Sequence, residues 1–381
     1  MLEKKTVLIF TPYYIPGFKG GGPIRSISNL VDALGNDFNF KIVTYDRDFG
    51  DQNSYKGIKQ NAWNTIGQAE VFYVNHNWIS FNNLKNFLNT IKYDLIYLNS
   101  FFSFKFSIMQ MLLRKLNLIP QKPIVLAPRG EFSPGALKIK EKKKTLFIYL
   151  TKLIKLHSNV QWHGTSLEEK EHIIQNFGDD LDIHVASNLP SSINHNLKSR
   201  KKVKGSLKLV FLSRISPKKN LDGALKSLKQ VSIPMVFNIY GPIEDSSYWD
   251  ECKKIIETLP SNILVKYEGE IDNNKVSTIF LNHDALFFPT HGENYGHVIV
   301  ESLLSGCPVI LSDQTPWREL DKHGIGWDIP LKESNRFAAI FQELYDMDEN
   351  DFGKISNNIR LYIDNNISNS DAIEDSIGLF S

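Results

Sequence analysis

Short runs of apolar and β-branched residues alternate with longer amphipathic stretches along most of the chain. Strands that alternate with helical patterns indicate βαβ units and a parallel sheet. In the first half, the runs predict strands over Thr6–Thr11, Phe40–Tyr45, Asp94–Leu98, Ile124–Ala127, Val160–His163 and Ile183–Ala186. The sequence therefore predicts a parallel α/β domain at residues 1–190.

Residues 191–206 interrupt this pattern with Pro, Ser and Asn followed by a basic run, which is the composition of a solvated linker. The basic residues are Lys198, Arg200, Lys201, Lys202 and Lys204. The alternation then restarts and predicts strands over Leu207–Leu212, Val236–Tyr240, Leu264–Tyr267, Ala285–Phe288 and Val309–Leu311. A second parallel α/β domain is therefore expected at 207–360, followed by a C-terminal helix at 361–381 that packs back onto the first domain.

The composition favours a folded two-domain protein in a reducing compartment. A chain of 381 residues exceeds the ~250–300 residues at which single cores stop growing, so two domains with a cleft are expected. The net charge of +2 provides no general attraction to nucleic acid. Cys252 and Cys307 lack the spacing of a disulfide framework or a metal site, and the apolar run near the N-terminus is too short to span a membrane. We therefore expect a cytoplasmic enzyme.

The segment Glu293–Glu301 carries two carboxylates eight residues apart, directly after a predicted strand. The residues between them are predicted to open a helix, with Glu293 before it and Glu301 about two turns inside it. Because the first N–H groups of a helix have no intrahelical partner, those of Tyr295, Gly296 and His297 are expected to form an anion site. A nucleotide diphosphate sugar would match this arrangement, and a capped helix start with an exposed glutamate is the alternative.

Two cations follow the predicted strand 207–212, with Arg214 at its end and Lys219 just before a predicted helix. In open α/β sheets, ligands bind at the carboxyl ends of the strands. Arg offers a bidentate fork and Lys a compact charge, and together they can neutralise a diphosphate leaving group without a metal. Lys218 is interpreted as an exposed charge in front of the helix.

A glycine-rich segment, Gly20–Arg25, follows the first predicted strand. Gly21 and Gly22 permit close approach of the backbone to a ligand, and Pro23 suits the first position of a helix. The spacing differs from the G-x-G-x-x-G of dinucleotide sites, and no acidic residue clearly takes the ribose-binding role. We therefore expect this loop to contact a phosphate or an acceptor.

The motif at Glu293–Glu301, its flanking residues and the Arg214–Lys219 segment resemble those of family 4 of the retaining glycosyltransferases. The resemblance implies the GT-B fold, an α/β architecture with two Rossmann-like domains that face each other across a cleft. It is specific from about Leu207 to Trp327 and weaker before that. It implies an acceptor domain at 1–190 and a nucleotide-sugar domain at 207–360.

The resemblance also implies roles for individual residues. Glu293 would contact the donor sugar and Glu301 the ribose. Arg214 and Lys219 would bind the diphosphate, and Arg214, Lys219 and Glu293 count as catalytic. Other donor contacts would come from Gly21, Gly22, Gly241, Ile271, Asn294, Tyr295, Gly296, His297 and Val298. The family is described by a front-face attack in which the leaving phosphate takes the acceptor proton, so no general base is required.

The first domain departs from the family pattern at Ala127–Phe132, where many members carry a His and this chain has Arg129. The Pro-Arg-Gly sequence resembles transferases that build bacterial surface polysaccharides. We therefore consider Arg129 a catalytic or acceptor-binding residue and Glu131 an acceptor-binding one, with a contact of both to the donor as the alternative. Asn99 ends a predicted strand at the same cleft and is a third acceptor candidate, with a strand-terminating turn as the alternative.

Two ring side chains near predicted strand ends are interpreted as structural. His163 is followed by Ser166 and Glu169 at the spacing of a capping box, which indicates the start of a helix. Trp317 follows the last predicted strand of the second domain and is interpreted as a packed aromatic that borders the donor pocket.

We therefore expect a retaining glycosyltransferase that moves a sugar from a nucleotide diphosphate sugar to a glycan or polyprenyl-linked acceptor. UDP is the expected nucleotide, and the expected pathway class is surface polysaccharide synthesis, such as O-antigen, capsule or exopolysaccharide. No Asp-x-Asp element stands where a diphosphate-bound metal needs it, so neither a metal nor a further cofactor is expected. Two alternatives remain open: a nucleotide-sugar epimerase of the same fold and a non-catalytic nucleotide-sugar-binding protein.

The lysine-rich segment Lys138–Lys144 precedes the apolar residues 146–150. Basic residues beside an amphipathic segment are attracted to an anionic membrane face by ~1 kcal/mol each. The segment therefore predicts peripheral contact with the cytoplasmic face of a membrane, with an ordinary solvated helix start as the alternative.

Overall fold

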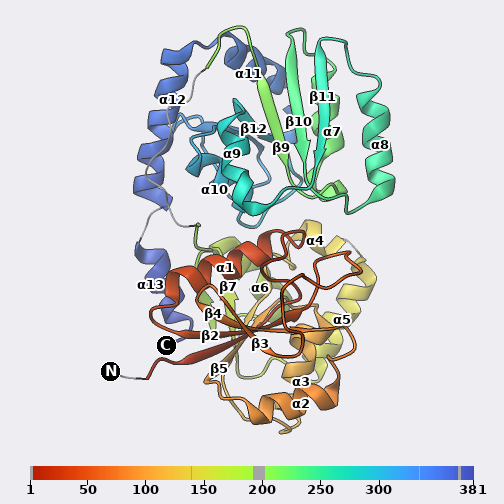
Figure 1. The fold of residues 1–381 in the computed structure, drawn as a ribbon, viewed down its shortest axis with the longest axis vertical. Helices are drawn as coiled ribbons and strands as arrows, with labels where there is room; N and C mark the ends of the chain where they lie inside the picture. The colour runs from red at the N-terminus through yellow and green to blue at the C-terminus, as the bar shows by residue number, and fades with distance from the viewer. Residues whose placement is uncertain (1–2, 139, 192–201, 334, 368–369) are drawn as a thin grey trace. The chain divides into compact units, whose positions relative to one another are not determined.

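A computed structural model describes residues 3–138, 140–191, 202–333, 335–367 and 370–381. The chain folds into two compact units, one formed by Met1–Ser192 with Ser370–Ser381 and the other by Ile193–Asn369. Each unit is built on its own sheet of mostly parallel strands with helices against it (Figure 1), which confirms the predicted α/β class. No helix among the described residues is long and apolar enough to cross a membrane.

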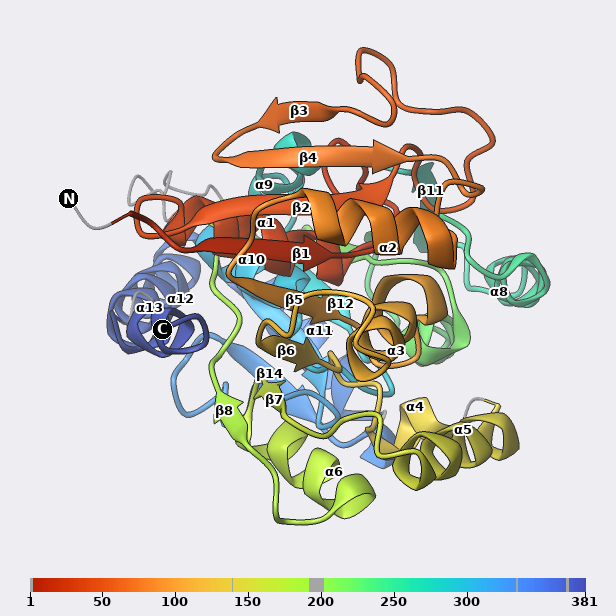
Figure 2. The ribbon, with the colours of Figure 1, turned by 90° about the horizontal axis from the view of Figure 1, so that it is seen from below.

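The first unit contains a sheet in the order β3-β4-β2-β1-β5-β6-β7-β8 (Figure 2). Its strands are β1 (Thr6–Phe10), β2 (Asn39–Tyr45), β3 (Trp63–Ile66), β4 (Ala69–Val74), β5 (Leu95–Asn99), β6 (Ile124–Ala127), β7 (Val160–Gly164) and β8 (Ile183–Val185). All neighbouring pairs are parallel except β3 and β4, which form an antiparallel hairpin at one edge. The predicted strands are confirmed to within one residue at each end, whereas this hairpin was not predicted.

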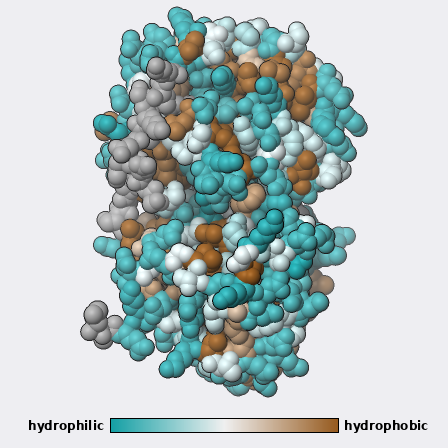
Figure 3. All heavy atoms as spheres, in the orientation of Figure 1, coloured by the Kyte–Doolittle hydropathy of each residue, from teal (hydrophilic) through white to brown (hydrophobic). Residues whose placement is uncertain are grey.

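The side chains of the first sheet alternate between two separate cores, as the pleat of a strand requires. The helices of this unit are α1 (Gly22–Leu34), α2 (Phe81–Thr90), α3 (Met109–Lys115), α4 (Pro134–Lys138), α5 (Glu141–Leu153), α6 (Leu167–Phe177) and α13 (Ser370–Gly378). Leu8 and Phe10 pack in one core with α2, α3, α5 and α6. Val7 and Ile9 pack in the other with α1 and the C-terminal Phe380. On the face drawn in Figure 3, hydrophilic residues predominate and hydrophobic ones form small groups.

The second unit contains an entirely parallel sheet in the order β11-β10-β9-β12-β13-β14. Its strands are β9 (Lys208–Leu212), β10 (Met235–Tyr240), β11 (Ile263–Gly269), β12 (Ala285–Phe288), β13 (Val309–Ser312) and β14 (Gly326–Ile329). Its helices are α7 (Leu221–Leu228), α8 (Ser246–Ile256), α9 (Val276–Leu281), α10 (His297–Leu304), α11 (Asn335–Asp346) and α12 (Glu349–Tyr362). Every predicted strand of this unit is confirmed to within two residues, and β14 was not predicted.

Two predictions about the connections need correction. The described end of the expected linker, 202–206, packs on the second unit: Lys202 is buried and its ammonium lies 3.4 Å from the carboxylate of Asp284. Residues 192–201, with the rest of the basic run, lie outside the described residues. The expected C-terminal helix at 361–381 is divided, because α12 runs to Tyr362 in the second unit and only α13 packs beside α1.

Each sheet has one point at which the strand order reverses. In the first sheet β1 lies between β2 and β5, and in the second sheet β9 lies between β10 and β12. The loops that leave the two strands at such a point diverge and open a crevice at the carboxyl ends of the strands, where open α/β sheets bind ligands. The candidate residues of the second unit follow β9 and β12, so they flank this point.

Candidate functional site

The loops that follow β9, β12 and β13 are joined to each other by hydrogen bonds. Asn220, in the loop after β9, donates from its side-chain amide to the carbonyl of Pro289 at 2.7 Å. The backbone N–H of Glu293, after β12, donates to the carbonyl of Gln314 at 3.1 Å. Asn220 has a left-handed backbone, φ 58°, which Asn tolerates better than most residues. The loops that carry the predicted site are therefore held in a fixed relation.

Lys219 and Glu293 form an ion pair at this crevice, although they are 74 positions apart in the chain. Their side chains are only 12% and 15% exposed, so solvent and salt screen the pair less than a surface pair. The ammonium of Lys219 also lies 5.5 Å from the centre of the Phe288 ring. The structure thus brings together two of the residues predicted to act on the donor.

Arg214 makes a different contact, donating from Nη1 to the carboxylate of Glu244 at 3.0 Å. The loops after β9 and β10 meet here, because Ile215 pairs with Ile243 and the N–H of Glu244 donates to the carbonyl of Ile215. Glu244 was not identified from the sequence. The signal that would have found it is an acidic residue just after β10, the strand beside β9.

The helix of the glutamate motif begins later than predicted. Gly296 caps α10 with a left-handed backbone, φ 79°, so Tyr295 lies in the preceding loop with Asn294. Because α10 begins at His297, the N–H groups of His297 and Val298 take no part in the hydrogen bonds within the helix. Glu301 therefore lies just over one turn inside α10, not two.

Gly241 is required by a close approach of two backbones. Its φ is 134°, and a Cβ at this position would lie 1.9 Å from the carbonyl oxygen of Ser213. Its N–H donates to the carbonyl of Gly269 at 2.8 Å. Ile271, the other predicted base-side residue, packs partly against the core. The close packing against Ser213, next to Arg214, is enough to explain a glycine at position 241, and no contact with a nucleotide base is needed for it.

The glycine loop of the first unit leads into α1 at the carboxyl end of β1. Gly21 occupies the N-cap position with φ 71° and Gly22 is the first residue of the helix, which places Pro23 second rather than first. Asp48, which was not predicted, accepts hydrogen bonds from the N–H groups of Phe18 and Lys19 at 2.6 and 2.9 Å. The approach to the helix is thus held by a carboxylate.

Arg129 and Asn99 lie together at the carboxyl ends of β5 and β6. Nε of Arg129 donates to Oδ1 of Asn99 at 2.6 Å. Its Nη1 donates to Oδ1 of Asn188 and its Nη2 to the hydroxyl of Tyr97, the latter at 2.6 Å. Sequence reasoning found the first two residues and missed Tyr97 and Asn188, because Tyr97 lies within a strand and Asn188 near the expected linker.

Glu131 is turned away from Arg129. Its carboxylate accepts hydrogen bonds from the hydroxyl of Ser100 at 2.7 Å and from the N–H groups of Phe101 and Phe102 at 2.6 and 3.1 Å. Burial raises the pKa of this carboxyl, and the three hydrogen bonds oppose the rise. Glu131 therefore has a structural role, because its carboxylate holds the loop after β5.

His163 and Ser166 have the structural roles that were predicted. The ring of His163 is buried between the hydroxyl of Tyr97 and the carbonyl of Ala186, each at 2.8 Å. Ser166 caps α6 by accepting from the N–H of Glu169 at 3.1 Å. The Glu169 carboxylate accepts from the N–H groups of Thr165 and Gly130.

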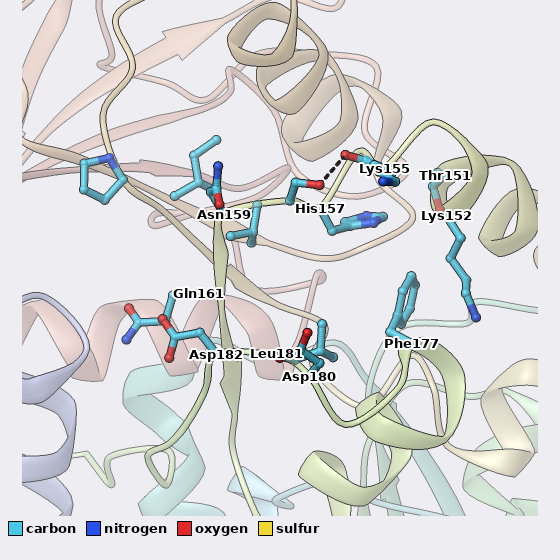
Figure 4. Close-up of a pocket in the computed structure, with 14 residues that line it drawn as sticks. Thr151, Lys152, Lys155, His157, Asn159, Gln161, Phe177, Asp180, Leu181 and Asp182 are labelled. Carbon is cyan, nitrogen blue, oxygen red and sulfur yellow. Dashed lines mark hydrogen bonds between the residues drawn. The ribbon is translucent and has the colours of Figure 1, made fainter.

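A hollow lies at the amino ends of β6 and β7, at the end of these strands opposite to Arg129, and is drawn in Figure 4. Lys152 extends beside the ring of Phe177 at its rim (Figure 4). His157 lines the hollow and packs against Phe101, Trp162 and Phe177, with ring centres 5.1–5.3 Å apart. Its Nε2 is buried without a hydrogen-bond partner among the described residues.

Acid is expected to destabilise the first unit through His157. Burial lowers the pKa of its ring to about 4, from the 6.5 that is usual for histidine. Between these pH values the unfolded chain binds the extra proton, so the free energy of unfolding falls by about 1.4 kcal/mol per pH unit as the pH drops. His157→Phe should therefore lose about 2 kcal/mol less than the wild type between pH 6.5 and pH 5 in urea denaturation. Equal losses in both proteins would contradict this assignment.

Comparison with known proteins identifies the second unit. Residues 192–361 match the family model described as glycosyl transferases group 1. An uncharacterized 41.2 kDa protein in the cps region of Klebsiella pneumoniae is 27% identical over 139 residues. That match spans 36% of this chain and 36% of the relative, so about a third of each protein is compared.

Solved structures resemble the whole chain. The structure of HepE from Anabaena in complex with UDP and glucose has a TM-score of 0.71 at 17% identity, covering 99% of this chain and 98% of HepE. Sucrose-phosphate synthase from Thermosynechococcus elongatus has a TM-score of 0.72 at 14% identity, with the same coverage of both chains. Residues 192–361 therefore resemble the glycosyl transferases group 1 family, and the chain as a whole has the GT-B fold.

Proposed function

We propose that this protein is a retaining glycosyltransferase that moves a sugar from a nucleotide diphosphate sugar, with UDP as the nucleotide, to a glycan or polyprenyl-linked acceptor. We place the reaction in surface polysaccharide synthesis at the cytoplasmic face of a membrane. The observation that carries the proposal is the Lys219–Glu293 ion pair at the strand reversal of the second sheet. The family match of 192–361 and the UDP bound in the similar HepE structure support it.

The second unit would act mainly by electrostatics. Arg214 and Lys219 both follow β9, and the first N–H groups of α10 follow β12, the adjacent strand. Positive groups fixed where charge develops on the departing diphosphate stabilise the transition state without reorganising during the reaction. Donor binding would exchange the present contacts of Arg214 and Lys219 for phosphate oxygens. Glu293 would then accept hydrogen bonds from the sugar, and the charge would be balanced without a divalent metal.

The direct test of the donor site is a thermal-shift screen of the purified protein against UDP, GDP and ADP and their common sugars. A ligand that binds only the folded protein raises its stability, by about 2.7 kcal/mol at a hundredfold excess over Kd. We expect stabilisation by the UDP series, and its loss in Arg214→Ala and Glu301→Ala. Stabilisation by none of the nucleotides would count against the transferase. Conversion of the donor sugar without acceptor would instead favour the epimerase.

The membrane part of the proposal rests on an unusual helix. The inner face of α5 packs through Ile148, but its outer face carries large apolar side chains that are 44–66% exposed. They are Leu146, Tyr149, Leu150, Leu153 and, directly after the helix, Ile154. This spacing is that of a stripe that normally faces a core. In Figures 1 and 2, α5 lies at the rim of the first unit with α4 alongside.

Charge indicates what covers this stripe. Lys142 and Lys143 are exposed and precede Leu146 and Leu150 by four and seven residues, which places them on the same side of the helix. Lys144, which the sequence had grouped with them, turns inward and donates to the carbonyl of Ala136 at 2.7 Å. An apolar stripe led by lysines fits an anionic lipid surface, where the helix would lie in the interface.

Replacing Leu150 and Leu153 together with Asp is expected to weaken binding to vesicles of phosphatidylglycerol and phosphatidylcholine at least tenfold. The change removes two apolar side chains, each worth about 1.5–3 kcal/mol when buried, and adds repulsion from anionic lipid. Flotation of the protein with the vesicles measures the effect. Leu167→Asp is the matched control, because Leu167 is an exposed leucine on α6, outside the stripe. No binding by the wild type, or equal binding by both variants, would refute the membrane contact.

A further inference from the structure

The guanidinium of Arg129 is surrounded by neutral acceptors. Its three hydrogen bonds end on the amide oxygens of Asn99 and Asn188 and on the hydroxyl of Tyr97. A guanidinium has five N–H groups, so two remain for a further partner. No salt bridge to Arg129 occurs within the described part of the chain. A full positive charge therefore stands here without a counterion.

The neighbouring carboxylates are committed elsewhere. Glu131 accepts from Ser100, Phe101 and Phe102, which holds the loop after β5. Glu169 is buried and accepts from the N–H groups of Gly130 and Thr165. Two acidic residues thus lie close to Arg129, but their carboxylate oxygens accept hydrogen bonds from backbone N–H groups. Through these hydrogen bonds, both carboxylates hold the backbone beside Arg129.

A relay of hydrogen bonds fixes the position of the guanidinium. The carbonyl of Ala186 can only accept, so Nε2 of His163 carries the proton and Nδ1 accepts from the hydroxyl of Tyr97. The oxygen of that hydroxyl is then free to accept from Nη2 of Arg129. Burial, together with the charge of Arg129, lowers the pKa of His163 to about 3, so the ring stays neutral and the relay keeps one direction.

The backbone supports the same arrangement. Arg129 has φ 57° and Gly130 φ 75°, two successive left-handed residues directly after β6 and Pro128. Such a conformation is strained for a non-glycine residue and persists only where the surroundings hold it. The bond from the N–H of Gly130 to Glu169 is part of that support. In this conformation the side chain of Arg129 extends from the end of β6 to the end of β5.

We infer that Arg129 binds an anionic group of the acceptor, a phosphate or a carboxylate, and that Tyr97 and His163 are positioning residues for it. That the anion belongs to the acceptor rests on the proposed function, in which Arg214 and Lys219 of the second unit bind the donor diphosphate. Both anions offer two oxygens to a guanidinium fork. A lipid-linked acceptor would supply the phosphate and an acidic sugar the carboxylate.

The experiment titrates inorganic phosphate, and separately methyl glucuronide, into the full chain by calorimetry with UDP saturating and ionic strength constant. Asn99→Asp is the sharpest variant, because it keeps the shape of the site and sets a carboxylate against Nε of Arg129. Asn82→Asp is its control, since it makes the same charge change at an exposed position of α2. Arg129→Lys keeps the charge and removes the fork, and Tyr97→Phe removes the positioning hydroxyl.

We expect one of the two anions to bind in the presence of UDP, which also tells the phosphate source from the carboxylate source. Its affinity should fall at least tenfold in Asn99→Asp and Arg129→Lys, and about three- to tenfold in Tyr97→Phe. Asn82→Asp should retain it, and UDP affinity should be unchanged in all four, which a merely structural role of Tyr97 would not give. Anion binding that UDP abolishes and Arg214→Ala removes would overturn the inference, as would binding unaffected by Asn99→Asp. If UDP does not bind, that result counts against the proposed function. The anion site is then judged from the same variants in the absence of UDP.

Discussion

Lys219→Ala is expected to reduce the rate of sugar transfer by about 10²–10³-fold with little loss of stability. This is the cost typical of removing one preorganised charge-stabilising donor from an active site. The ammonium of Lys219 is mostly shielded from solvent beside Glu293, so its effect on a diphosphate is weakly screened. Loss of the cation also leaves Glu293 unpaired beside the leaving group, which adds repulsion. Release of UDP from the donor, followed at saturating substrate, measures the rate.

The neighbouring lysine provides the matched control. Lys218 has the same charge and lies next to Lys219 in the chain, and its backbone carbonyl accepts from the hydroxyl of Thr290 and the N–H of His291. Lys218→Ala should therefore keep transfer within about threefold of the wild type, since replacing the side chain leaves that carbonyl in place. Equal losses in both variants would mean that general charge, not position, matters. Assays with EDTA and with Mg²⁺ complete the test, because recovery of Lys219→Ala by Mg²⁺ alone, with an EDTA-sensitive wild type, would assign the charge role to a metal.

Gly241→Ala is expected to destabilise the second unit by about 3 kcal/mol or more and to abolish donor binding. The left-handed φ of 134° is strained for alanine, at a cost of about 1–3 kcal/mol. The added Cβ would also lie 1.9 Å from the carbonyl oxygen of Ser213, which is backbone and cannot rotate away. Relief requires the ends of β9 and β10 to separate, and this moves Arg214. Urea denaturation and UDP titration report the two effects.

Gly269→Ala separates the strain of the backbone from the clash. Gly269 also has a positive φ, 80°, but a Cβ there would meet nothing within 4 Å. Alanine at this position should cost only about 1–2 kcal/mol, the usual penalty of a left-handed alanine, and leave UDP affinity close to the wild type. If Gly241→Ala were no worse than Gly269→Ala, the close approach at Ser213 would not be the reason for glycine at 241.

Most of the strands that the sequence predicted correctly are buried. β1, β5, β6 and β12 consist almost wholly of apolar residues, because both faces of a parallel sheet are covered, and such runs are visible in one dimension. Three strands were missed, β3, β4 and β14. β4 is six residues long and largely buried, whereas β3 and β14 lie at sheet edges, are four residues long and have partly exposed side chains. Their pairing partners define them, and a short mixed segment carries no periodicity of its own.

The charged residues show the same division. Arg214, Lys219, Glu293 and Arg129 were found because each follows a recognisable strand. Their partners were not, since Glu244, Tyr97 and Asn188 become neighbours only through the order of the strands and the course of the loops. Lys202 was assigned to a solvated linker and Lys144 to a membrane-facing basic segment, whereas packing buries the first and turns the second inward.

The sequence by itself determined the α/β class, most of the strand positions in both sheets and the residue types available at their carboxyl ends, because hydrophobic runs and local turn chemistry are properties of adjacent residues. Only the tertiary structure decided which charges meet. Lys219 reaches Glu293 because β9 and β12 are neighbours, whereas the carboxylates of Glu131 and Glu169 accept hydrogen bonds from backbone N–H groups. Such contacts depend on the distance in space between residues far apart in the chain, and no local pattern encodes that distance.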